Sequence, residues 1–493
     1  MGTSPRPLDD APERCPKYLK LAKGFERQLE MGSLRIGDRL PSVRQLRQEH
    51  RVSLATAVSC YAWLERQGYV RARPKSGFFV SRVPIPEGPT PDIVARPRGP
   101  FPVRLAASRA EAVPVERPAE PLRLGPAVVG PALLPMNRLN RSLRLALSAF
   151  ADHAIRPEDP RGELRLRRQI ARICFRQGIT CSSQDVLVTA GETEATSLAL
   201  RVVARPGDVV ALESPGCYEV LQALEAYGLR AVEIPHMPGE GIDLRLLAAE
   251  ARRRRIAALL LSATCHNALG DCASEGSKAE LVALATRLDL PIVEGDPFGD
   301  LVWSRERPRA LKAFDTAGVV IHCGSLAHHL APGFNLGWIN AGRWHAAVER
   351  LRTFGDLALP RLPQLALAEF LESGAFEKHL RQLRLALWRS VEASRTEILR
   401  TFPPGTRVSR PEGGFVLWVQ LPEGYDGLEL QRAAAAVGIE ILAGELFSAA
   451  GQYTNCVRIA CGHPFETLRP ALLRLVGLLK RARGREGRLR PGA

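Results

Sequence analysis

The chain has 493 residues, of which 45% are hydrophobic and 24% are charged. This length leaves room for about two to four domains, at roughly 100 to 200 residues per domain, and the composition excludes a mostly disordered or collagen-like chain. No run of about 18 apolar residues is present, which excludes a membrane-spanning helix. The N-terminus has no apolar signal segment, so we expect a cytoplasmic protein.

The net charge of +16 is concentrated at the two ends of the chain. Residues 1–82 carry 16 Lys and Arg against 8 Asp and Glu, and residues 480–493 carry 6 against 1, so these segments have net charges of +8 and +5. Such a local excess indicates a polyanionic partner for the N-terminal segment. The ten Cys include no C-x-x-C pair, which indicates buried thiols in a reducing compartment.

The N-terminal segment has the pattern of a small helical unit with a β-hairpin. Residues 17–31 are periodic enough for a helix. Ser42 is placed to cap a second helix, and Ser53 is the expected N-cap of a third. Two short strands, at 69–73 and 77–81, flank the turn PKSG. A helix, turn, helix and wing in this order are typical of a DNA-reading domain.

The segment LPSVRQL, the pattern V-S-x-x-T-x-x-x-x-Y-x-x-L-x-x-x-G-Y-V and the wing ending SGFFV resemble the N-terminal domain of GntR-type transcription regulators over residues 17–82. The resemblance implies a winged helix-turn-helix domain that binds double-stranded operator DNA. The residues that it places at the DNA are Arg44 after the P-S turn, Ser53 and Thr56 at the start of the recognition helix, and Ser76 and Gly77 in the wing.

Three positions depart from the GntR pattern. Leu54 stands where an arginine is common, Val58 is apolar, and Lys75 replaces a wing glycine. The base preference therefore stays open, because Arg is the usual reader of guanine. We expect Arg73 and Lys75 to add phosphate contacts, which position a protein on DNA rather than specify a sequence.

Residues 83–121 contain ten prolines, so we expect an extended interdomain linker. From about Leu122 onward, short apolar runs such as DVLVTA, DVVALE, PIVEGD and GVVIHCGS alternate with helical patterns. This alternation predicts an α/β fold with a mainly parallel sheet and crossover helices. The segment VSRPEGGFVLWVQL predicts a hairpin, and we expect residues 481–493 to form a disordered basic tail.

Several stretches within 122–480 resemble fold-type I pyridoxal-phosphate aminotransferases: DPRGELRLRRQIA, TAGETEATSLALR, HNALG, VEGDPFGDL, CGSLAHHLAPGFNLGWI and VRIACG. The resemblance implies a PLP-transferase-like domain with a smaller α+β C-terminal part at about 370–480. A GntR-type head joined to such a domain resembles the architecture of MocR-type regulators. That resemblance implies a homodimer.

The family motif S-x-S-K-x-x-A-P-G-x-R-x-G aligns with residues 325–337, where two of its key positions differ. The lysine that forms the internal aldimine falls at His328, and imidazole cannot replace a primary amine in that reaction. The phosphate-binding arginine falls at Asn335, which loses a bidentate charged contact.

Four more positions of the family's cofactor site differ. The Asp that pairs with the pyridine nitrogen and the Tyr on the ring oxygen fall at Gly295 and Phe298. A register slip bringing Asp296 into the site is an open alternative, because a one-residue shift reverses side-chain direction in a strand. The ring-stacking aromatic and the Tyr that reaches across the dimer fall at Cys217 and Pro157.

Other positions match the family. Asn267 matches the Asn on the ring oxygen, Gly191 and Ser325 match parts of the phosphate cradle, and Arg458 matches the arginine that clamps a substrate carboxylate. Each also has a structural interpretation, as a turn, a strand end or a paired interior cation. With His328, the first three would form a vestigial pocket, and Arg458 would contact a small anionic or amino-acid-like effector.

The adjacent pair His328–His329 does not predict a metal site, because neighbours on a loop rarely ligate one metal and no further ligand stands at a defined spacing. We therefore expect a transcription regulator without a bound cofactor, a metal or catalytic residues. Two alternatives stay open. One is a working pyridoxal-phosphate aminotransferase with a DNA-binding head, in which Lys278 or Lys312 reaches the pocket, and the other is an architectural DNA-binding dimer without an effector.

Overall fold

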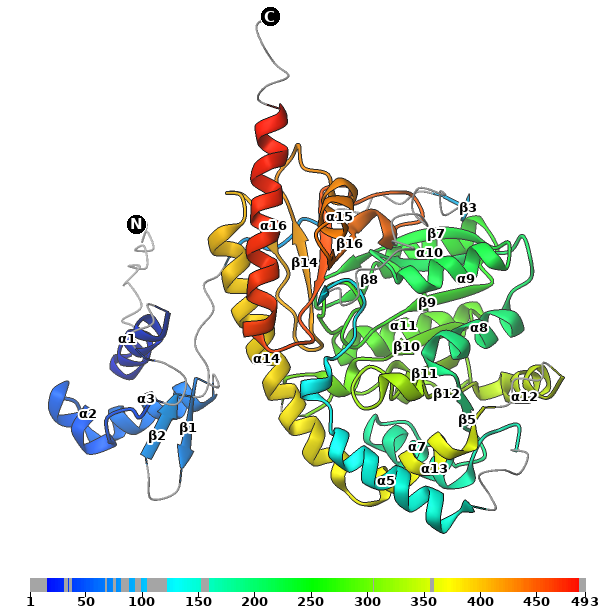
Figure 1. Ribbon diagram of the computed structural model, residues 1–493, viewed down its shortest axis with the longest axis horizontal. Helices are drawn as coiled ribbons and strands as arrows, with labels where there is room; N and C mark the ends of the chain where they lie inside the picture. The colour runs from blue at the N-terminus through cyan, green and yellow to red at the C-terminus, as the bar shows by residue number, and fades with distance from the viewer. Residues whose placement is uncertain are drawn as a thin grey trace, which may run out of the picture. The chain divides into compact units, whose positions relative to one another are not determined.

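The computed structural model describes residues 16–30, 34, 38–66, 69–73, 77–80, 88–93, 99–103, 122–151, 159–304, 306–354 and 359–486. The chain divides into two compact units, Met1–Glu87 and Gly88–Ala493 (Figure 1). Among the described helices, none combines the length and the apolar character that crossing a membrane requires.

The smaller unit is a winged helix. Three helices precede an antiparallel pair of strands, in the order α1 (Lys17–Glu30), α2 (Val43–Glu49), α3 (Leu54–Arg66), β1 (Val70–Arg73) and β2 (Gly77–Val80). The helices and strands predicted from the sequence are confirmed. The apolar sides of all three helices and both strands share one core, in which the Tyr61 ring stacks on the Phe78 ring with 4.4 Å between centroids.

The larger unit is built on a nine-stranded sheet with the order β3-β7-β6-β9-β10-β11-β12-β5, in which β8 pairs with β7. The central strands β7, β6, β9, β10 and β11 are parallel, whereas β12 is antiparallel to both of its neighbours. The mainly parallel α/β sheet predicted from the sequence is confirmed. The strands are β3 (Phe101–Pro102), β5 (Leu187–Thr189), β6 (Val209–Ser214), β7 (Arg230–Met237), β8 (Gly241–Ile242), β9 (Ala258–Leu261), β10 (Ile292–Asp296), β11 (Val320–Ser325) and β12 (Gly337–Asn340).

Helices cover both faces of this sheet because successive side chains of a strand point to opposite faces. On β6, Val210 and Leu212 pack with helices α8, α9 and α12, whereas Ala211 packs with α10 and α11. Both layers are visible around the sheet in Figure 1. These helices are α8 (Gly191–Val203), α9 (Tyr218–Ala226), α10 (Leu244–Arg253), α11 (Glu275–Leu288) and α12 (His345–Phe354).

The remaining elements surround a second core. The 27-residue helix α14 (Ala375–Thr401) joins a helical layer to a four-stranded antiparallel sheet of order β13-β14-β17-β16. The predicted hairpin is confirmed as the antiparallel pair β13–β14. The other elements here are β4 (Leu122–Arg123), α5 (Met136–Ala149), α7 (Leu164–Arg176), α13 (Arg361–Glu372), β13 (Arg407–Val408), β14 (Val416–Gln420), α15 (Gly427–Ala435), β15 (Ile439–Glu440), β16 (Leu442–Ala443), β17 (Cys456–Ala460) and α16 (Phe465–Glu486).

Two expectations about segments without regular structure need correction. Within the Pro-rich stretch, β3 pairs antiparallel with β7 and Val103 is buried in the core of the larger unit. An edge strand tolerates Pro102 because its missing N–H can face away from the sheet. Helix α16 continues to Glu486 through the first part of the predicted tail, since Lys, Arg and Glu are good helix formers.

Candidate functional site

The two helices expected to approach DNA begin at side-chain caps. Ser42 Oγ accepts the Gln45 N–H at 3.2 Å, and the Gln45 side chain accepts the Ser42 N–H at 2.8 Å, which is a capping box. Ser53 Oγ accepts the Thr56 N–H at 3.1 Å and lies 2.8 Å from the Thr56 hydroxyl. Both predicted caps are confirmed, and the second fixes where α3 begins.

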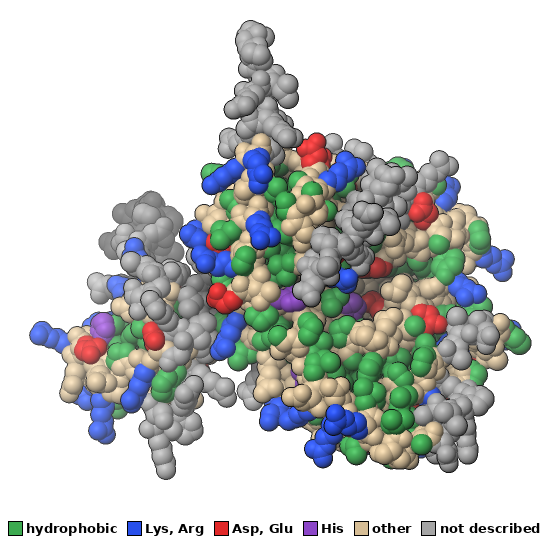
Figure 2. All heavy atoms as spheres, viewed as in Figure 1, with side chains coloured by type: hydrophobic (Ala, Val, Ile, Leu, Met, Phe, Trp, Pro, Cys, Tyr) green, Lys and Arg blue, Asp and Glu red, His purple; other side chains and the backbone are tan. Residues whose placement is uncertain are grey.

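The residues expected at the DNA surround this helix start. Arg44 is exposed on α2, Ser53 is exposed, and Thr56 is half-buried. Gly77 begins β2 with a φ of +100°, and the Arg39 guanidinium packs over it. The side chain of Arg73, together with Lys75 and Ser76, lies outside the described residues. Figure 2 shows several Lys and Arg side chains projecting from this unit.

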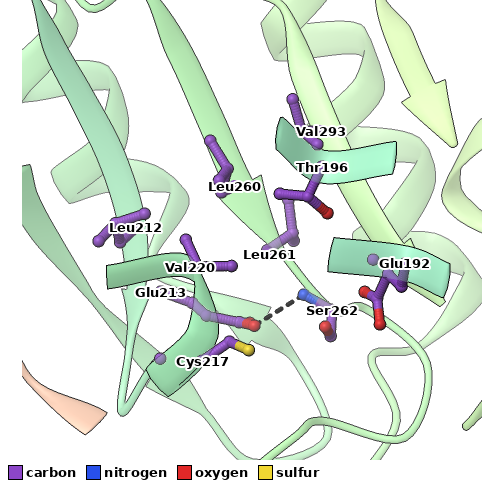
Figure 3. Close-up of a pocket in the computed structure, with 12 residues that line it drawn as sticks. Glu192, Thr196, Leu212, Glu213, Cys217, Val220, Leu260, Leu261, Ser262 and Val293 are labelled. Carbon is purple, nitrogen blue, oxygen red and sulfur yellow. Dashed lines mark hydrogen bonds between the residues drawn. The ribbon is translucent and has the colours of Figure 1, made fainter. Parts of the chain in front are cut away.

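A pocket in the larger unit lies at the C-terminal ends of β6, β9 and β10, beside the first turns of α8 and α9 (Figure 3). Crevices at the carboxyl ends of parallel strands are the usual ligand sites of α/β sheets. Carboxyl, hydroxyl and thiol groups stand among aliphatic side chains in its lining, and none of the lining residues is Lys, Arg or His. The polar members are Glu192, Thr196, Glu213, Cys217 and Ser262.

Strand β10 determines which side chains reach this pocket. Val293 and Gly295 line it, whereas Asp296 points to the opposite face, where it is paired with Arg307 and lies 3.2 Å from His322 Nε2. Burial by itself would raise the pKa of Asp296, but its cationic neighbours lower that pKa to about 2. The alternative in which Asp296 enters the site is therefore wrong, because the strand is in regular register.

Glu192 occupies the space above Gly295. A Cβ atom added at residue 295 would collide with Glu192 Oε1, so the carboxyl of the α8 residue stands where a side chain from β10 would project. Burial raises the pKa of Glu192 well above its ordinary value, and the negative charges of Glu219 and Asp296 raise it further. This part of the pocket therefore disfavours any added negative charge.

His328 follows β11 and is held by the backbone. Its Nδ1–H donates to the Ala127 carbonyl at 3.1 Å, and its ring meets Phe298 edge-on with 5.0 Å between centroids. Burial lowers the pKa of His328, which favours the neutral form of the ring. The ring of neighbouring His329 packs instead against Phe376, so the two imidazoles lie in different surroundings.

The larger unit contains four lysines, and none of them lines the pocket. Lys278 Nζ donates to the Thr264 hydroxyl at 2.6 Å and to a backbone carbonyl at 2.8 Å. Lys312 Nζ donates to a backbone carbonyl at 2.6 Å and pairs with a carboxylate at 3.2 Å. Lys378 and Lys480 are exposed on α14 and α16.

The backbone at Gly191, one of the positions expected to surround a phosphate, has the turn conformation that such a site requires. Gly191 begins α8 with a φ of +74°, a conformation that favours glycine, and the Asn335 side chain packs against it. Asn335 Nδ2 reaches the Ala190 carbonyl at 3.5 Å. On the other side, Ser325 Oγ accepts the Ala327 N–H at 3.0 Å. These groups offer dipoles but no positive charge.

Arg458 and Asn267 are brought together. Arg458 Nη1 donates to Asn267 Oδ1 at 2.5 Å, Nη2 donates to the Gly125 carbonyl at 2.9 Å, and the guanidinium lies 4.8 Å from the centroid of the Phe447 ring. Arg458 is buried, and among the described residues it pairs with no carboxylate. Its burial lowers its pKa. An interior cation with only neutral partners is costly, so this guanidinium has capacity for an anion.

One buried polar cluster was not predicted. Atoms of Glu213, His236 and His266 lie within 4.8 Å of one another, a spacing that would suit a metal ion. His266 Nδ1, however, accepts the N–H groups of Ala268 and Leu269, both at 3.2 Å. The proton of neutral His266 therefore resides on Nε2, which faces Glu213 Oε2 at 3.4 Å and cannot also ligate a metal.

The second histidine of this cluster carries a charge. His236 Nε2 donates to Asp271 at 2.9 Å, and its Nδ1 lies 3.7 Å from Glu213. Burial would lower the pKa of His236, but the two carboxylates raise it to about 9. The cluster is thus a buried ion network. One indication of this cluster is visible in the sequence, namely polar residues at the ends of apolar strands. That pattern does not reveal which strand ends lie next to each other in the fold.

Comparisons with known proteins agree with this geometry. Residues 17–80 match the bacterial regulatory proteins of the gntR family, and residues 156–475 match aminotransferase class I and II. The α-aminoadipate aminotransferase LysN from Thermus thermophilus, complexed with N-(5'-phosphopyridoxyl)-L-leucine, has a TM-score of 0.70 at 25% identity, covering 77% of this chain and 96% of that chain.

Two relatives match along nearly the whole chain. The uncharacterized HTH-type transcriptional regulators YjiR and YdcR of Escherichia coli (strain K12) are each 33% identical, over 478 and 452 residues. The alignments cover 94% of this chain and 99% of YjiR, and 90% of this chain and 94% of YdcR. With a GntR head and an aminotransferase class I and II domain in one polypeptide, the chain belongs to the MocR-type family of HTH transcriptional regulators.

Proposed function

We propose that this regulator binds operator DNA through its head and that its aminotransferase-like unit no longer forms a covalent link to pyridoxal phosphate. The observation that carries the proposal is the position of the lysines. An internal aldimine requires a primary amine, and Lys278 and Lys312 are engaged away from the pocket. His328, at the aligned position, is a neutral imidazole bonded to the backbone.

Electrostatics support the same proposal. A phosphate at the start of α8 would meet the Glu192 carboxyl, and the neutral Asn335 amide would stand in for a guanidinium. Each charged hydrogen bond is worth about 1.5–3 kcal/mol, whereas micromolar affinity requires about 8 kcal/mol. The pocket residues therefore do not fit pyridoxal phosphate.

The larger unit then serves dimerisation and ligand sensing. We assign Arg458 as the contact for a ligand carboxylate, because it is buried with neutral partners and carries hydrogen-bonding capacity at Nε that no described residue uses. In a homodimer, two heads bound to two half-sites would gain effective concentration through the connecting chain. An effector would act by shifting the placement of the heads.

At the DNA, the proposal assigns phosphate contacts to Arg73 and Lys75, and placement of the recognition helix to Ser53 and Thr56. Exposed Arg44 lies on the helix before it and is free to reach the backbone or a base edge. The wing residues Ser76 and Gly77 complete this surface. Binding of this kind weakens as salt rises, because each neutralised phosphate releases counterions.

The test is the visible absorption spectrum of the purified full-length protein, before and after titration with pyridoxal phosphate. We expect no aldimine band and no saturable change, in the wild type and in His328→Lys alike, because the lysine alone does not replace the lost Asp and Arg positions. A saturable band that borohydride reduces in the wild type, or transamination by His328→Lys, would contradict the proposal and favour the aminotransferase alternative.

Ligand sensing has a separate test. A thermal-shift screen with small carboxylates and phosphates should find a carboxylate that raises the melting temperature of the wild type. The shift should disappear in Arg458→Lys, which keeps the charge but loses the planar fork, and should persist in Arg432→Lys, a matched exposed position. No stabilising carboxylate would contradict ligand sensing and leave an architectural DNA-binding dimer.

A further inference from the structure

Recognition helix α3 has one buried face and one exposed face of unusual composition. Its buried face packs into the core through Ala57, Tyr61 and Leu64, each with 0% exposure. At the edge of this buried face, Leu54 is 52% exposed and Val58 is 48% exposed. These two side chains lie one helical turn apart, so they form a single apolar surface at the N-terminal end of α3.

The exposed residues nearest to Leu54 and Val58 on α3 are uncharged. Ala55, Ser59 and Ala62 are exposed beside these two residues. The one acidic residue of α3, Glu65, is engaged, since its Oε1 accepts the Ala72 N–H of β1 at 3.0 Å. Leu54 and Val58 therefore offer a small exposed apolar surface, bordered by uncharged side chains, that a partner could cover.

Basic side chains indicate which partner this surface meets. On the preceding helix and turn, Arg44, Arg47 and Arg51 are exposed and form no ion pair among the described residues. Free guanidinium groups beside a helix N-terminus favour a polyanion, and the first turns of a recognition helix are the part that contacts base edges in the major groove.

The chemistry of the base edges then selects among the four bases. Leucine and valine cannot donate or accept hydrogen bonds, so placing them against the polar edge of guanine, adenine or cytosine would desolvate groups without pairing them. The 5-methyl group of thymine is the apolar group that projects into the major groove and that apolar side chains contact.

We infer that Leu54 and Val58 read thymine 5-methyl groups in the major groove and thereby set the base preference of the head. The inference rests on the proposed DNA-binding function and adds the ligand group that α3 recognises. It also accounts for the leucine at position 54, where GntR-type domains commonly have an arginine. A side chain that contacts a methyl group does not need the bidentate hydrogen bonds with which arginine binds guanine.

The experiment first selects tight-binding duplexes from a random pool with the full-length protein at one fixed salt concentration. Each thymine of the selected duplex is then replaced singly by uracil, which differs from thymine in the methyl group alone. We expect one or two replacements to weaken binding about fourfold each, the value for burying one methyl-sized group. The remaining replacements should leave the Kd unchanged.

Variants connect this loss to the two side chains. The double variant Leu54→Ala, Val58→Ala should bind the thymine and uracil duplexes equally, because the surface that contacts the methyl groups is removed. Arg44→Ala is the matched control, expected to bind both duplexes more weakly and to keep their ratio. Since both apolar residues are exposed, circular dichroism and melting of the double variant should match the wild type. Leu54→Arg should shift the preference at its base pair from thymine to guanine.

Three outcomes would overturn the inference. One is equal binding of all uracil duplexes by the wild type, and another is an undiminished uracil penalty in the double variant. The third is a change of oligomeric state in the double variant by sedimentation, which would assign the surface to a second copy of the chain. Failure to select any sequence would instead contradict the DNA-binding proposal itself, so the two failures are distinguishable.

Discussion

Charged side chains are used in opposite ways in the two units of this protein. In the head, Arg44 and Arg47 are exposed without ion-pair partners among the described residues. In the larger unit, the Arg307 side chain, which is 8% exposed, pairs with Asp296 and Asp300, and His236 is buried between two carboxylates. The exposed arginines of the head can pair with an external polyanion, whereas the buried cations of the larger unit already pair with carboxylates of the same unit.

If pyridoxal phosphate binding is lost as proposed, the difference shows how an aminotransferase fold keeps its structure without the charges that hold the cofactor. The phosphate and the amine site of a cofactor need charges that face a pocket. Here none of the residues that line the pocket is Lys, Arg or His, and Glu192 stands in the pocket instead. Because buried ion networks are strongly destabilised when one partner is removed, they maintain the fold whether or not a ligand binds.

The largest effect on stability is expected from a substitution at Glu213, which belongs to the buried ion network. Glu213→Gln leaves protonated His236 with one carboxylate fewer and should lower the free energy of unfolding of the larger unit by about 3–5 kcal/mol. Urea unfolding followed by tryptophan fluorescence measures this. The exposed Glu240→Gln should change it by about 0.5 kcal/mol or less, and equal effects of the two substitutions would contradict the network.

The same network predicts a dependence of stability on pH. The folded-state pKa of His236 is raised to about 9, so its contribution is complete below the unfolded pKa of about 6.5 and disappears as pH rises through 9. The pKa of Asp271 is lowered to about 2, chiefly by His236 acting against burial, so its contribution is lost as pH falls below about 4.

We therefore expect the melting temperature to fall between pH 6.5 and 9.5 by several degrees, at roughly 2–4 °C per kcal/mol for domains of a few hundred residues. Differential scanning calorimetry of the wild type measures the fall. In His236→Gln the curve should be flatter over this range. A wild-type melting temperature that stays constant or rises would contradict the assigned protonation.

In the head, removing one exposed charge should change DNA binding by a smaller amount. Arg44→Ala should reduce the slope of log K against log salt concentration by about 1, because one phosphate contact and its released counterion are lost. Fluorescence anisotropy across a salt series measures the slope. Arg432→Ala, an exposed arginine of the larger unit, should leave it unchanged.

The smallest expected effect concerns the cap of α3. Ser53→Ala removes the acceptor for the Thr56 N–H and should cost about 1 kcal/mol of helix stability, seen as faster amide hydrogen exchange in the first turn of α3. Ser53→Asp retains a cap and should restore slow exchange. Equal exchange in wild type and Ser53→Ala would mean that the cap does not stabilise the helix.

Local chemistry made much of the fold predictable. Ser42 and Ser53 act on N–H groups three residues away, so their caps could be inferred from the sequence. Apolar runs such as those of β6 and β10 predicted buried parallel strands, because such a run is also a pattern of neighbouring residues. The Pro-rich stretch was predicted less well, because nothing local indicates that Phe101 belongs to an edge strand that pairs with β7.

Some features of the candidate site could likewise be predicted from the sequence, and others could not. Residue types at motif positions, such as His328 in place of a lysine, could be read directly. That Glu192 from α8 fills the space above Gly295 could not, because residues from two separate elements meet only after the sheet forms. The Glu213, His236 and His266 cluster escaped prediction for this reason too.

The sequence by itself determined the two-part architecture, the alternating elements of the larger unit and the identity of every residue at the cofactor motif. The first two follow from hydrophobic periodicity, capping and proline content, which act over a few residues, whereas the cofactor-motif positions follow from the resemblance to fold-type I aminotransferases. Tertiary structure alone decided which charges are exposed and which are paired. Asp296 and Gly295 are neighbours in the chain, yet the pleat of β10 sends one to an ion pair and leaves the other open to the pocket.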